Sequence, residues 1–81
     1  MNVAYSRRFL REFAAAPADV QTAFDKQVRL LRLNARHPSL RIKKYNVERE
    51  LWQGRVNRDW RFYFTIDGDT YSLHSITAHP K

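Results

Sequence analysis

Residues 60–73 read WRFYFTIDGDTYSL, in which apolar and polar side chains alternate on both sides of Asp67-Gly68. Alternation with a period of two is typical of a half-buried strand. Asp-Gly favours a two-residue hairpin loop, because the primed turns that join antiparallel strands require a positive φ. We therefore predict a β-hairpin with Asp67 and Gly68 as its loop. The predicted cross-strand pairs are Ile66 with Asp69, Phe64 with Tyr71, Tyr63 with Ser72, Phe62 with Leu73 and Arg61 with His74.

The same alternation continues outward, over residues 51–56 before the hairpin and up to residue 78 at its end. Residues 57–59 (NRD) then form a three-residue loop that pairs Val56 with Trp60 and Trp52 with Phe64. This register places the large apolar side chains on one face of the sheet, which we predict to be the core. They are Trp52, Val56, Trp60, Phe62, Phe64, Ile66, Tyr71 and Leu73.

The N-terminal half has helical periodicity. Residues 2–5 favour a short strand, and Ser6 is a typical N-cap for a helix that ends near Ala15. A second helix is predicted over residues 17–34, since Pro17 is tolerated in a first turn and Asn34 favours a helix end. Its apolar stripe comprises Val20, Ala23, Phe24, Gln27, Val28 and Leu31. Residues 40–42 (LRI) have strand character.

These elements predict one α+β domain over residues 1–81, with two N-terminal helices packed on one face of a small antiparallel β-sheet of about four strands. A chain of 81 residues without Cys has no disulfide framework, and no apolar run approaches the length of a membrane span. We expect a cytoplasmic protein that does not bind a membrane.

The charge is unevenly distributed. The chain carries 15 Lys and Arg against 8 Asp and Glu, a net charge of +7. Eight of these cations but only three acidic residues fall within residues 35–61. Such clustering indicates a polyanionic partner, either nucleic acid or a ribosome. The alternative is a solvated basic surface that serves solubility.

The predicted register also sets Arg55 directly opposite Arg61, on the sheet face away from the helices. Like charges that face each other across strands are destabilising. An anion bound between the two guanidinium groups would remove this repulsion. Alternatively, Asp59, Glu48 or Glu50 folds back and pairs with the arginines.

The order strand–helix–helix–strands and four segments together resemble the RelE/ParE superfamily of bacterial type II toxin–antitoxin toxins, over approximately residues 3–81. The segments are HPSLR (residues 37–41), ELWQGRV (residues 50–56), DWRFYF (residues 59–64) and ITAH (residues 76–79). RelE-like members cut mRNA in the ribosomal A site, whereas ParE-like members inhibit DNA gyrase and have no nuclease chemistry. Both are neutralised by an antitoxin.

The resemblance implies a toxin that acts as a ribosome-dependent, metal-independent mRNA endoribonuclease and inhibits translation. Its implied partners are a cognate antitoxin, mRNA and the ribosome, with higher-order toxin–antitoxin assembly. Two alternatives stay open. One is a non-enzymatic gyrase inhibitor of the same fold, and the other is an RNA-binding module without toxicity.

The resemblance also implies the catalytic residues. Arg61 corresponds to a catalytic position of nucleolytic members, Arg55 to the basic residue of the preceding strand, and His79 or Lys81 to the basic residue that ends the last strand. Arginines stabilise the charge of a phosphorane, and an imidazole transfers protons near neutral pH. We expect Arg55, Arg61 and His79 to be catalytic. His74 is the second candidate for proton transfer, and both histidines are ordinary surface residues on the alternative reading.

The remaining basic and aromatic residues are expected to bind RNA. The predicted set is Arg41, Lys43, Lys44, Arg58, Tyr63, His74 and Lys81. Arg41, Lys43 and Lys44 could equally protect an edge strand from aggregation, and Tyr45 and Tyr63 could either stack on a base or pack. No cofactor or metal site is predicted, because the three His lack zinc-binding spacing and residues 67–69 (DGD) lack the rest of a calcium loop.

Overall fold

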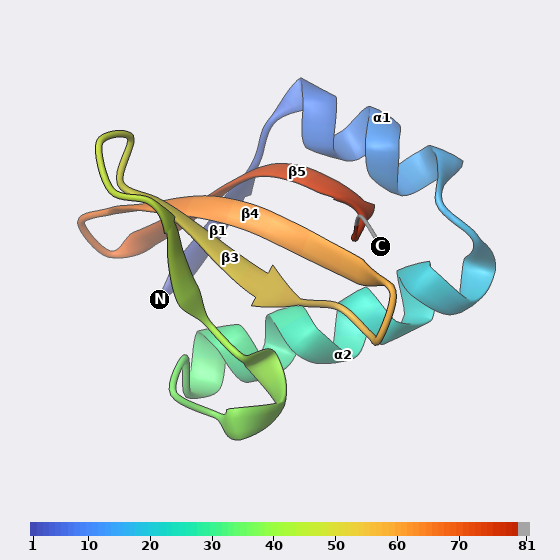
Figure 1. Cartoon of the computed structure of the whole chain (residues 1–81), viewed down its shortest axis with the longest axis horizontal. Helices are drawn as coiled ribbons and strands as arrows, with labels where there is room; N and C mark the ends of the chain where they lie inside the picture. The colour runs from blue at the N-terminus through green and yellow to red at the C-terminus, as the bar shows by residue number, and fades with distance from the viewer. Residues whose placement is uncertain (80–81) are drawn as a thin grey trace.

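The computed structural model describes residues 1–79, which form two helices and a five-stranded sheet. The elements in chain order are β1 (Asn2–Tyr5), α1 (Arg7–Ala15), α2 (Ala18–Leu33), a 3₁₀ turn η1 (Pro38–Leu40), β2 (Lys43–Asn46), β3 (Leu51–Arg55), β4 (Trp60–Asp67) and β5 (Thr70–Ala78). In the sheet the strands follow the order β1-β5-β4-β3-β2. The predicted α+β class is confirmed, and Figure 1 shows α2 beneath the sheet and α1 beside β5. Neither helix is long and apolar enough to cross a lipid bilayer.

The sheet is mixed, whereas a wholly antiparallel sheet of about four strands was predicted. β2, β3, β4 and β5 pair antiparallel, but β1 lies parallel to β5, with Asn2 opposite Thr70 and Tyr5 opposite Leu73. No turn links β1 to its partner, because both helices and three strands separate them in the chain. The direction of β1 is therefore not encoded by any local signal.

The helix ends follow the predicted capping residues. Ser6 Oγ accepts a hydrogen bond from the Phe9 N–H at 3.0 Å, and α2 begins after Pro17 and ends at Asn34. The strand predicted over residues 40–42 is wrong. Leu40 ends η1, Arg41 adopts the left-handed region with φ 45°, and strand β2 begins only at Lys43.

The β4–β5 hairpin exists, but its predicted register is wrong by one loop residue. Gly68 and Asp69 form the loop, so that Asp67 pairs with Thr70 and Ile66 with Tyr71. Gly68 has φ +62°, which fits the type II′ turn that places Gly first in the loop. The new register shifts the partners of residues 64–66 by two positions, and a shift of two leaves their side chains on the predicted face.

A β-bulge at His74 changes the alternation in the second half of β5. Phe64 pairs with Leu73 and Tyr63 with Ser75, which leaves His74 as the extra residue. Beyond the bulge, Ile76 faces the core and is 1% exposed, although the sequence did not predict it there. The predicted pairs Arg61–His74 and Tyr63–Ser72 are replaced by Arg61–Thr77 and Tyr63–Ser75.

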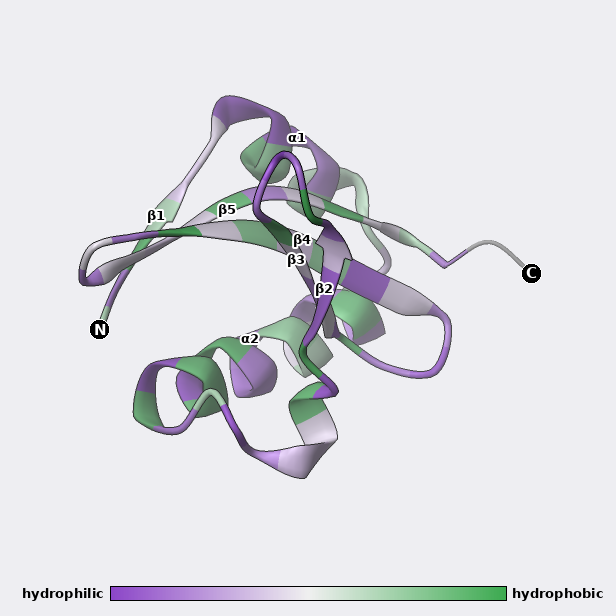
Figure 2. Ribbon diagram, turned by 60° about the vertical axis from the view of Figure 1, so that its left-hand side comes forward, coloured by the Kyte–Doolittle hydropathy of each residue, from purple (hydrophilic) through white to green (hydrophobic). Residues whose placement is uncertain are grey.

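The core lies between α2 and the sheet, and in Figure 2 hydrophobic segments of β4 and β5 lie above α2. The Phe24 ring of α2 meets the Phe62 ring edge-on at 5.6 Å. Trp52 and Trp60 are only half-buried at the margin, and Ile66 is 45% exposed because it lies at the far end of the hairpin, which corrects its predicted core position. The core comprises Phe9, Ala16, Val20, Phe24, Leu31, Leu40, Val56, Phe62, Phe64, Tyr71, Leu73 and Ile76.

Gly54 of β3 lies directly opposite Phe62, and the Phe62 ring covers it. A Cβ at this position would overlap the ring. The absence of a side chain therefore leaves room for the tip of the Phe62 ring against the neighbouring strand.

Helix α1 protects the half of β5 that β1 does not reach. The Glu12 carboxylate accepts the Ile76 N–H at 3.2 Å, and the Ser6 N–H donates to the Leu73 carbonyl at 3.0 Å. Phe9 extends from α1 into the core, where its ring lies 5.1 Å from that of Phe24. The helix thus covers an exposed sheet edge, where unpaired backbone groups would otherwise promote aggregation.

Candidate nucleic-acid interface

The sheet face opposite α2, which we call the open face, carries two arginines at one cross-strand position. Arg55 of β3 pairs with Arg61 of β4, as the sequence predicts. Both side chains are half-buried. Partial burial lowers the pKa of Arg61, and the positive charges of Arg55 and Arg41 lower it further. An arginine remains protonated at neutral pH even so, so the pair presents two repelling cations.

The Arg61 guanidinium is fixed by the backbone of the β3–β4 turn. Its Nη1 donates to the carbonyl oxygens of Asn57 at 2.7 Å, Trp60 at 2.9 Å and Arg58 at 3.3 Å. The turn is itself braced, because Asn57 Oδ1 accepts the N–H groups of Asp59 and Trp60 at 3.0 Å each. The guanidinium is therefore preorganised at the end of the open face.

Within the part of the chain that the structure describes, no carboxylate forms a salt bridge with this pair. The one salt bridge within residues 1–79 joins Arg8 to Glu12. The alternative in which Asp59, Glu48 or Glu50 pairs with the two arginines is therefore wrong. Asp59 still raises the pKa of Arg61 through its charge, but this is a smaller effect than the lowering by burial and by Arg55.

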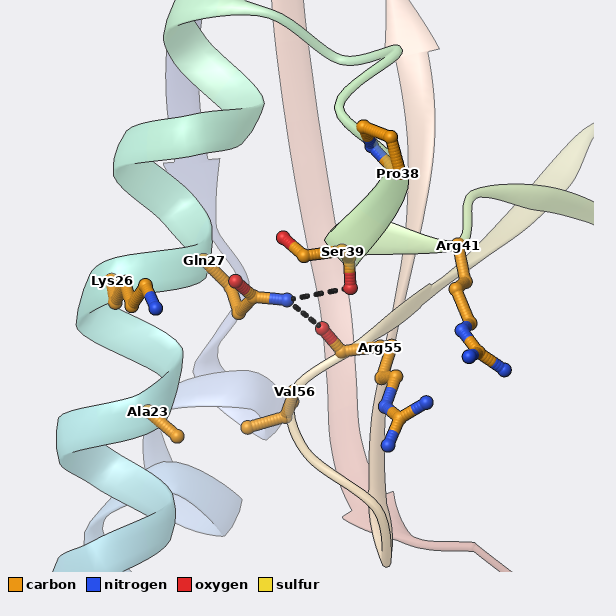
Figure 3. Close-up of a pocket in the computed structure, with 8 residues that line it drawn as sticks. All are labelled: Ala23, Lys26, Gln27, Pro38, Ser39, Arg41, Arg55 and Val56. Carbon is orange, nitrogen blue, oxygen red and sulfur yellow. Dashed lines mark hydrogen bonds between the residues drawn. The ribbon is translucent and has the colours of Figure 1, made fainter.

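Arg41 joins the pair from the C-terminal end of η1. Figure 3 shows the side chains of Arg41 and Arg55 extending in the same direction. Both arginines line a cleft of about 530 Å³ between α2, η1 and the end of β3. The left-handed backbone of Arg41 turns the chain there, and non-Gly residues in this conformation occur disproportionately at functional sites.

Gln27 connects the elements that present these arginines. Its Nε2 donates to the Arg55 carbonyl at 2.8 Å and to the Ser39 carbonyl at 3.1 Å, and the side chain is 6% exposed (Figure 3). Sequence reasoning placed Gln27 in the apolar stripe of the second helix without assigning it a role. The available signal was a polar amide on a face that is otherwise apolar, since a buried amide must find hydrogen-bond partners.

The two candidate proton-transfer histidines lie in different places. The His79 N–H donates to the Asp59 carbonyl at 2.6 Å, which brings its backbone beside the turn that holds Arg61. His79 is exposed, two residues beyond the Thr77 that pairs with Arg61. His74 sits instead at the bulge, where its Nε2 lies 2.8 Å from Thr65 Oγ1. The structure thus brings the backbone of His79, and not His74, beside the turn that holds Arg61.

The basic run 41–44 is divided between the two sides of the sheet. Lys43 pairs with Gln53, whose side chain is on the open face, where its Nε2 donates to Tyr63 Oη at 3.0 Å. Lys44 pairs with Trp52 on the opposite face, and its ammonium lies 4.4 Å from the centre of the indole ring. Of the two lysines, only Lys43 therefore shares a face with the arginine pair.

Three further predicted residues have distinct positions. Tyr63 lies on the open face, and the exposed Tyr45 ring meets it edge-on at 4.9 Å. Arg58 is exposed in the β3–β4 turn. Lys81 lies outside the described residues. Within residues 1–79 no cluster of His, Asp and Glu has the geometry of a metal site.

Three solved structures share the fold of this chain over nearly its whole length. The YoeB/ParE toxin from Agrobacterium tumefaciens has a TM-score of 0.80 at 10% identity, covering 99% of this chain and 100% of that chain. YafQ from E. coli strain BL21(DE3) has a TM-score of 0.79 at 12% identity, covering 96% and 92%. The heterotetrameric YoeB–YefM toxin–antitoxin complex from Staphylococcus aureus contains a chain with a TM-score of 0.77 at 14% identity, covering 99% and 98%.

No protein-family model and no curated protein matches the sequence. The structural likenesses, at 10–14% identity, establish the fold. The chain has the fold of the YoeB and ParE toxins, as its resemblance to the RelE/ParE superfamily predicts.

Proposed function

We propose that this protein is the toxin of a type II toxin–antitoxin system and that it cleaves mRNA on the ribosome without a metal ion. The observation that carries the proposal is the Arg55–Arg61 pair, which is half-buried on the open face and has no carboxylate partner among residues 1–79. A protein that keeps two cations together at this cost is expected to bind an anion between them. The phosphate of an RNA chain is such an anion.

Metal-independent RNA cleavage proceeds by attack of a 2′-OH on the adjacent phosphorus. The new P–O bond gives a charged phosphorane, and the 5′ oxygen of the next nucleotide then leaves with a proton. Arg55 and Arg61 stabilise the phosphorane charge, and a well-placed donor of this kind contributes ~3–4 kcal/mol to the lowering of the barrier. Arg61 is fixed before substrate binds, so little reorganisation is needed.

His79 transfers the proton in this mechanism, from the attacking 2′-OH to the leaving 5′ oxygen. Its backbone is held beside the Arg61 turn by Asp59, and its side chain is free in solvent until the complex with RNA and ribosome forms. General acid–base catalysis by a positioned imidazole contributes about 10²–10⁴-fold. In this proposal cleavage depends on the ribosome because the His79 side chain becomes ordered only when mRNA and the ribosome are bound.

The rest of the open face and its rim bind the RNA backbone and bases in this proposal. Arg41, Lys43 and Arg58 contact phosphates around the arginine pair, and Tyr63 offers a ring to a base. Lys44 is not included, because its ammonium is engaged with Trp52 on the other face. His74 binds RNA at a distance from the scissile phosphate, and Lys81 completes the set of proposed contacts.

The proposed protein partner is a cognate antitoxin, and the proposed location is the cytoplasm, where translating ribosomes are found. The YoeB–YefM complex of Staphylococcus aureus, which shares the fold, is a heterotetramer of toxin and antitoxin. We accordingly propose a higher-order assembly for this chain and its antitoxin as well.

A second candidate function is inhibition of DNA gyrase without catalysis. One observation favours it: all three hydrogen bonds of Arg61 go to carbonyls of its own turn, as expected of a residue that braces a protein-binding surface. Gyrase has a polyanionic substrate too, so net charge does not separate the two functions.

The test is expression of the chain from a tightly controlled promoter, with mapping of mRNA 5′ ends and a supercoiling assay with purified gyrase. The proposed nuclease produces new 5′ ends within translated codons only, and the Arg61→Ala variant does not. Intact transcripts together with loss of supercoiling would establish the gyrase alternative. Normal growth with RNA binding alone would leave an RNA-binding module.

A further inference from the structure

A second basic pocket lies on the open face, toward the β4–β5 turn and away from the arginine pair. This pocket of about 260 Å³ has Leu51 on its wall, and its polar lining residues are Arg8, Arg49, Tyr63, Thr65, His74 and Ser75. We call it the Arg8–Arg49 pocket. Its lining comes from α1, the β2–β3 turn and strands β3, β4 and β5. The fold thus brings together cations that are 41 positions apart in the sequence.

Both arginines of the pocket keep most of their charge available. Arg8 lies 3.6 Å from the Glu12 carboxylate, but its side chain is 67% exposed, and an exposed pair of this kind is worth at most ~1 kcal/mol. Glu12 is also engaged by the Ile76 N–H. Arg49 has no ion pair within residues 1–79. An anion would therefore meet two cations that are little neutralised.

A chain of hydrogen bonds orients His74 at the same pocket. Thr65 and Ser72 donate to Asp67 Oδ2 at 3.2 and 2.7 Å. Because the Thr65 hydroxyl proton is used in this way, Thr65 Oγ1 is left to accept from His74 Nε2 at 2.8 Å. The second ring nitrogen of His74, Nδ1, has no hydrogen-bond partner within residues 1–79. His74 is the extra residue of the bulge and has no partner on β4, which allows its ring to approach Thr65.

Two aromatic rings lie between this pocket and the arginine pair. Tyr63 is two residues from Arg61 and two residues from Thr65 along β4, so the backbone positions of Arg61 and of Thr65, which lines the pocket, are about 13 Å apart. The Tyr45 ring is 58% exposed and contacts the Tyr63 ring at 4.9 Å. Along the open face the aromatic pair therefore follows the Arg55–Arg61 pair and precedes the two arginines of the Arg8–Arg49 pocket.

We infer that the Arg8–Arg49 pocket binds a second phosphate of a single-stranded RNA whose scissile phosphate lies at Arg55 and Arg61, with one base on the Tyr45–Tyr63 pair. This inference rests on the proposed RNA-cleaving function. It sets a minimum length for tight binding, because only a strand that spans both sites can engage both. Stacking on an aromatic residue adds ~1–3 kcal/mol per base in such complexes.

The test measures the affinity of full-length protein for 2′-O-methyl oligoribonucleotides, which resist cleavage, as a dinucleotide and as a pentanucleotide. The pentanucleotide should bind more tightly than the dinucleotide. The double variant Arg8→Gln/Arg49→Gln should lose this gain, and its salt slope with the pentanucleotide should fall by about 1. The control is Arg29→Gln, an exposed arginine of α2 that lines a different pocket. It should keep the gain.

The outcomes separate the two proposals. Equal affinities of the two oligonucleotides for the unaltered protein, or a gain that survives in the double variant, would overturn the second phosphate site and leave the cleavage proposal standing. If the pocket variants lose the gain while Arg61→Gln still cleaves mRNA, the pocket stands and the catalytic assignment falls. NMR adds an independent readout: the His74 ring signals should shift with the pentanucleotide and stay unchanged with the dinucleotide.

Discussion

Gln27 Nε2 lies 2.8 Å from the carbonyl oxygen of Arg55, so a buried amide of α2 holds the strand residue whose guanidinium faces Arg61. The same amide group holds the Ser39 carbonyl. A single side chain thereby connects the helix, the turn before β2 and the strand that bears a proposed catalytic residue.

Replacing Gln27 by Met is expected to destabilise the protein by about 1–3 kcal/mol, because two carbonyls lose their donor in a site that excludes water. Urea unfolding of the two proteins measures the difference. The control is Gln21→Met, since Gln21 donates to the single Phe13 carbonyl and is less buried. A smaller loss is expected there. Equal losses would mean that the Gln27 amide has no special role.

Arg61→Ala should reduce mRNA cleavage on translating ribosomes by about 10²–10³-fold, the effect of removing one preorganised donor. Arg61→Lys keeps the charge but loses the fork geometry, so it should restore only part of the activity. The control is Arg58→Ala in the same turn, which should mainly weaken RNA binding. Full cleavage by Arg61→Ala would disprove the assignment.

Gly54→Ala should destabilise the fold by about 1–3 kcal/mol through collision with the Phe62 ring. Combining it with Phe62→Leu should recover part of that loss, because the smaller side chain frees the space. Gly68 provides the contrast. A Cβ there meets no atom within 4 Å, but its φ of +62° is strained for Ala, so Gly68→Ala should cost about 1 kcal/mol that no second substitution recovers. Unfolding measurements on the three variants decide between collision and strain.

Glu12→Ala should destabilise the protein by about 1 kcal/mol, since the Ile76 N–H loses its acceptor at the sheet edge. Glu12→Gln retains an acceptor oxygen and removes the charge, so it should be less harmful. If instead both variants unfold at the same urea concentration, the charge pair with Arg8 matters more than the hydrogen bond to the strand. Hydrogen exchange of the Ile76 amide should be faster in Glu12→Ala alone.

The positions that the sequence predicted correctly are those set by local rules. Ser6, Pro17 and Asn34 mark the helix ends through capping, and the loop over residues 57–59 fixes the Arg55–Arg61 pair. The core face of the hairpin was predicted correctly as far as Leu73, because the loop error moved the partners of residues 64–66 by an even number of residues.

The features that sequence reasoning missed depend on contacts between distant segments. The parallel pairing of β1 with β5 has no turn to signal it, and the bulge at His74 is visible only once β4 is paired. The conformation of Arg41 and the approach of Gln27 to Arg55 likewise require η1, α2 and β3 in place together. The arginine pair could thus be predicted, whereas the cleft beside it could not.

The extra residue at the bulge makes β5 a strand with two phases. Before His74, odd-numbered positions point inward, and after it the even-numbered Ile76 does so. Replacing His74 by another residue would keep both phases of the alternation, whereas deleting it would put the whole strand in a single phase. The end of the strand would then expose Ile76 and bury its polar neighbours. The fold therefore depends more on the length of β5 than on the identity of residue 74.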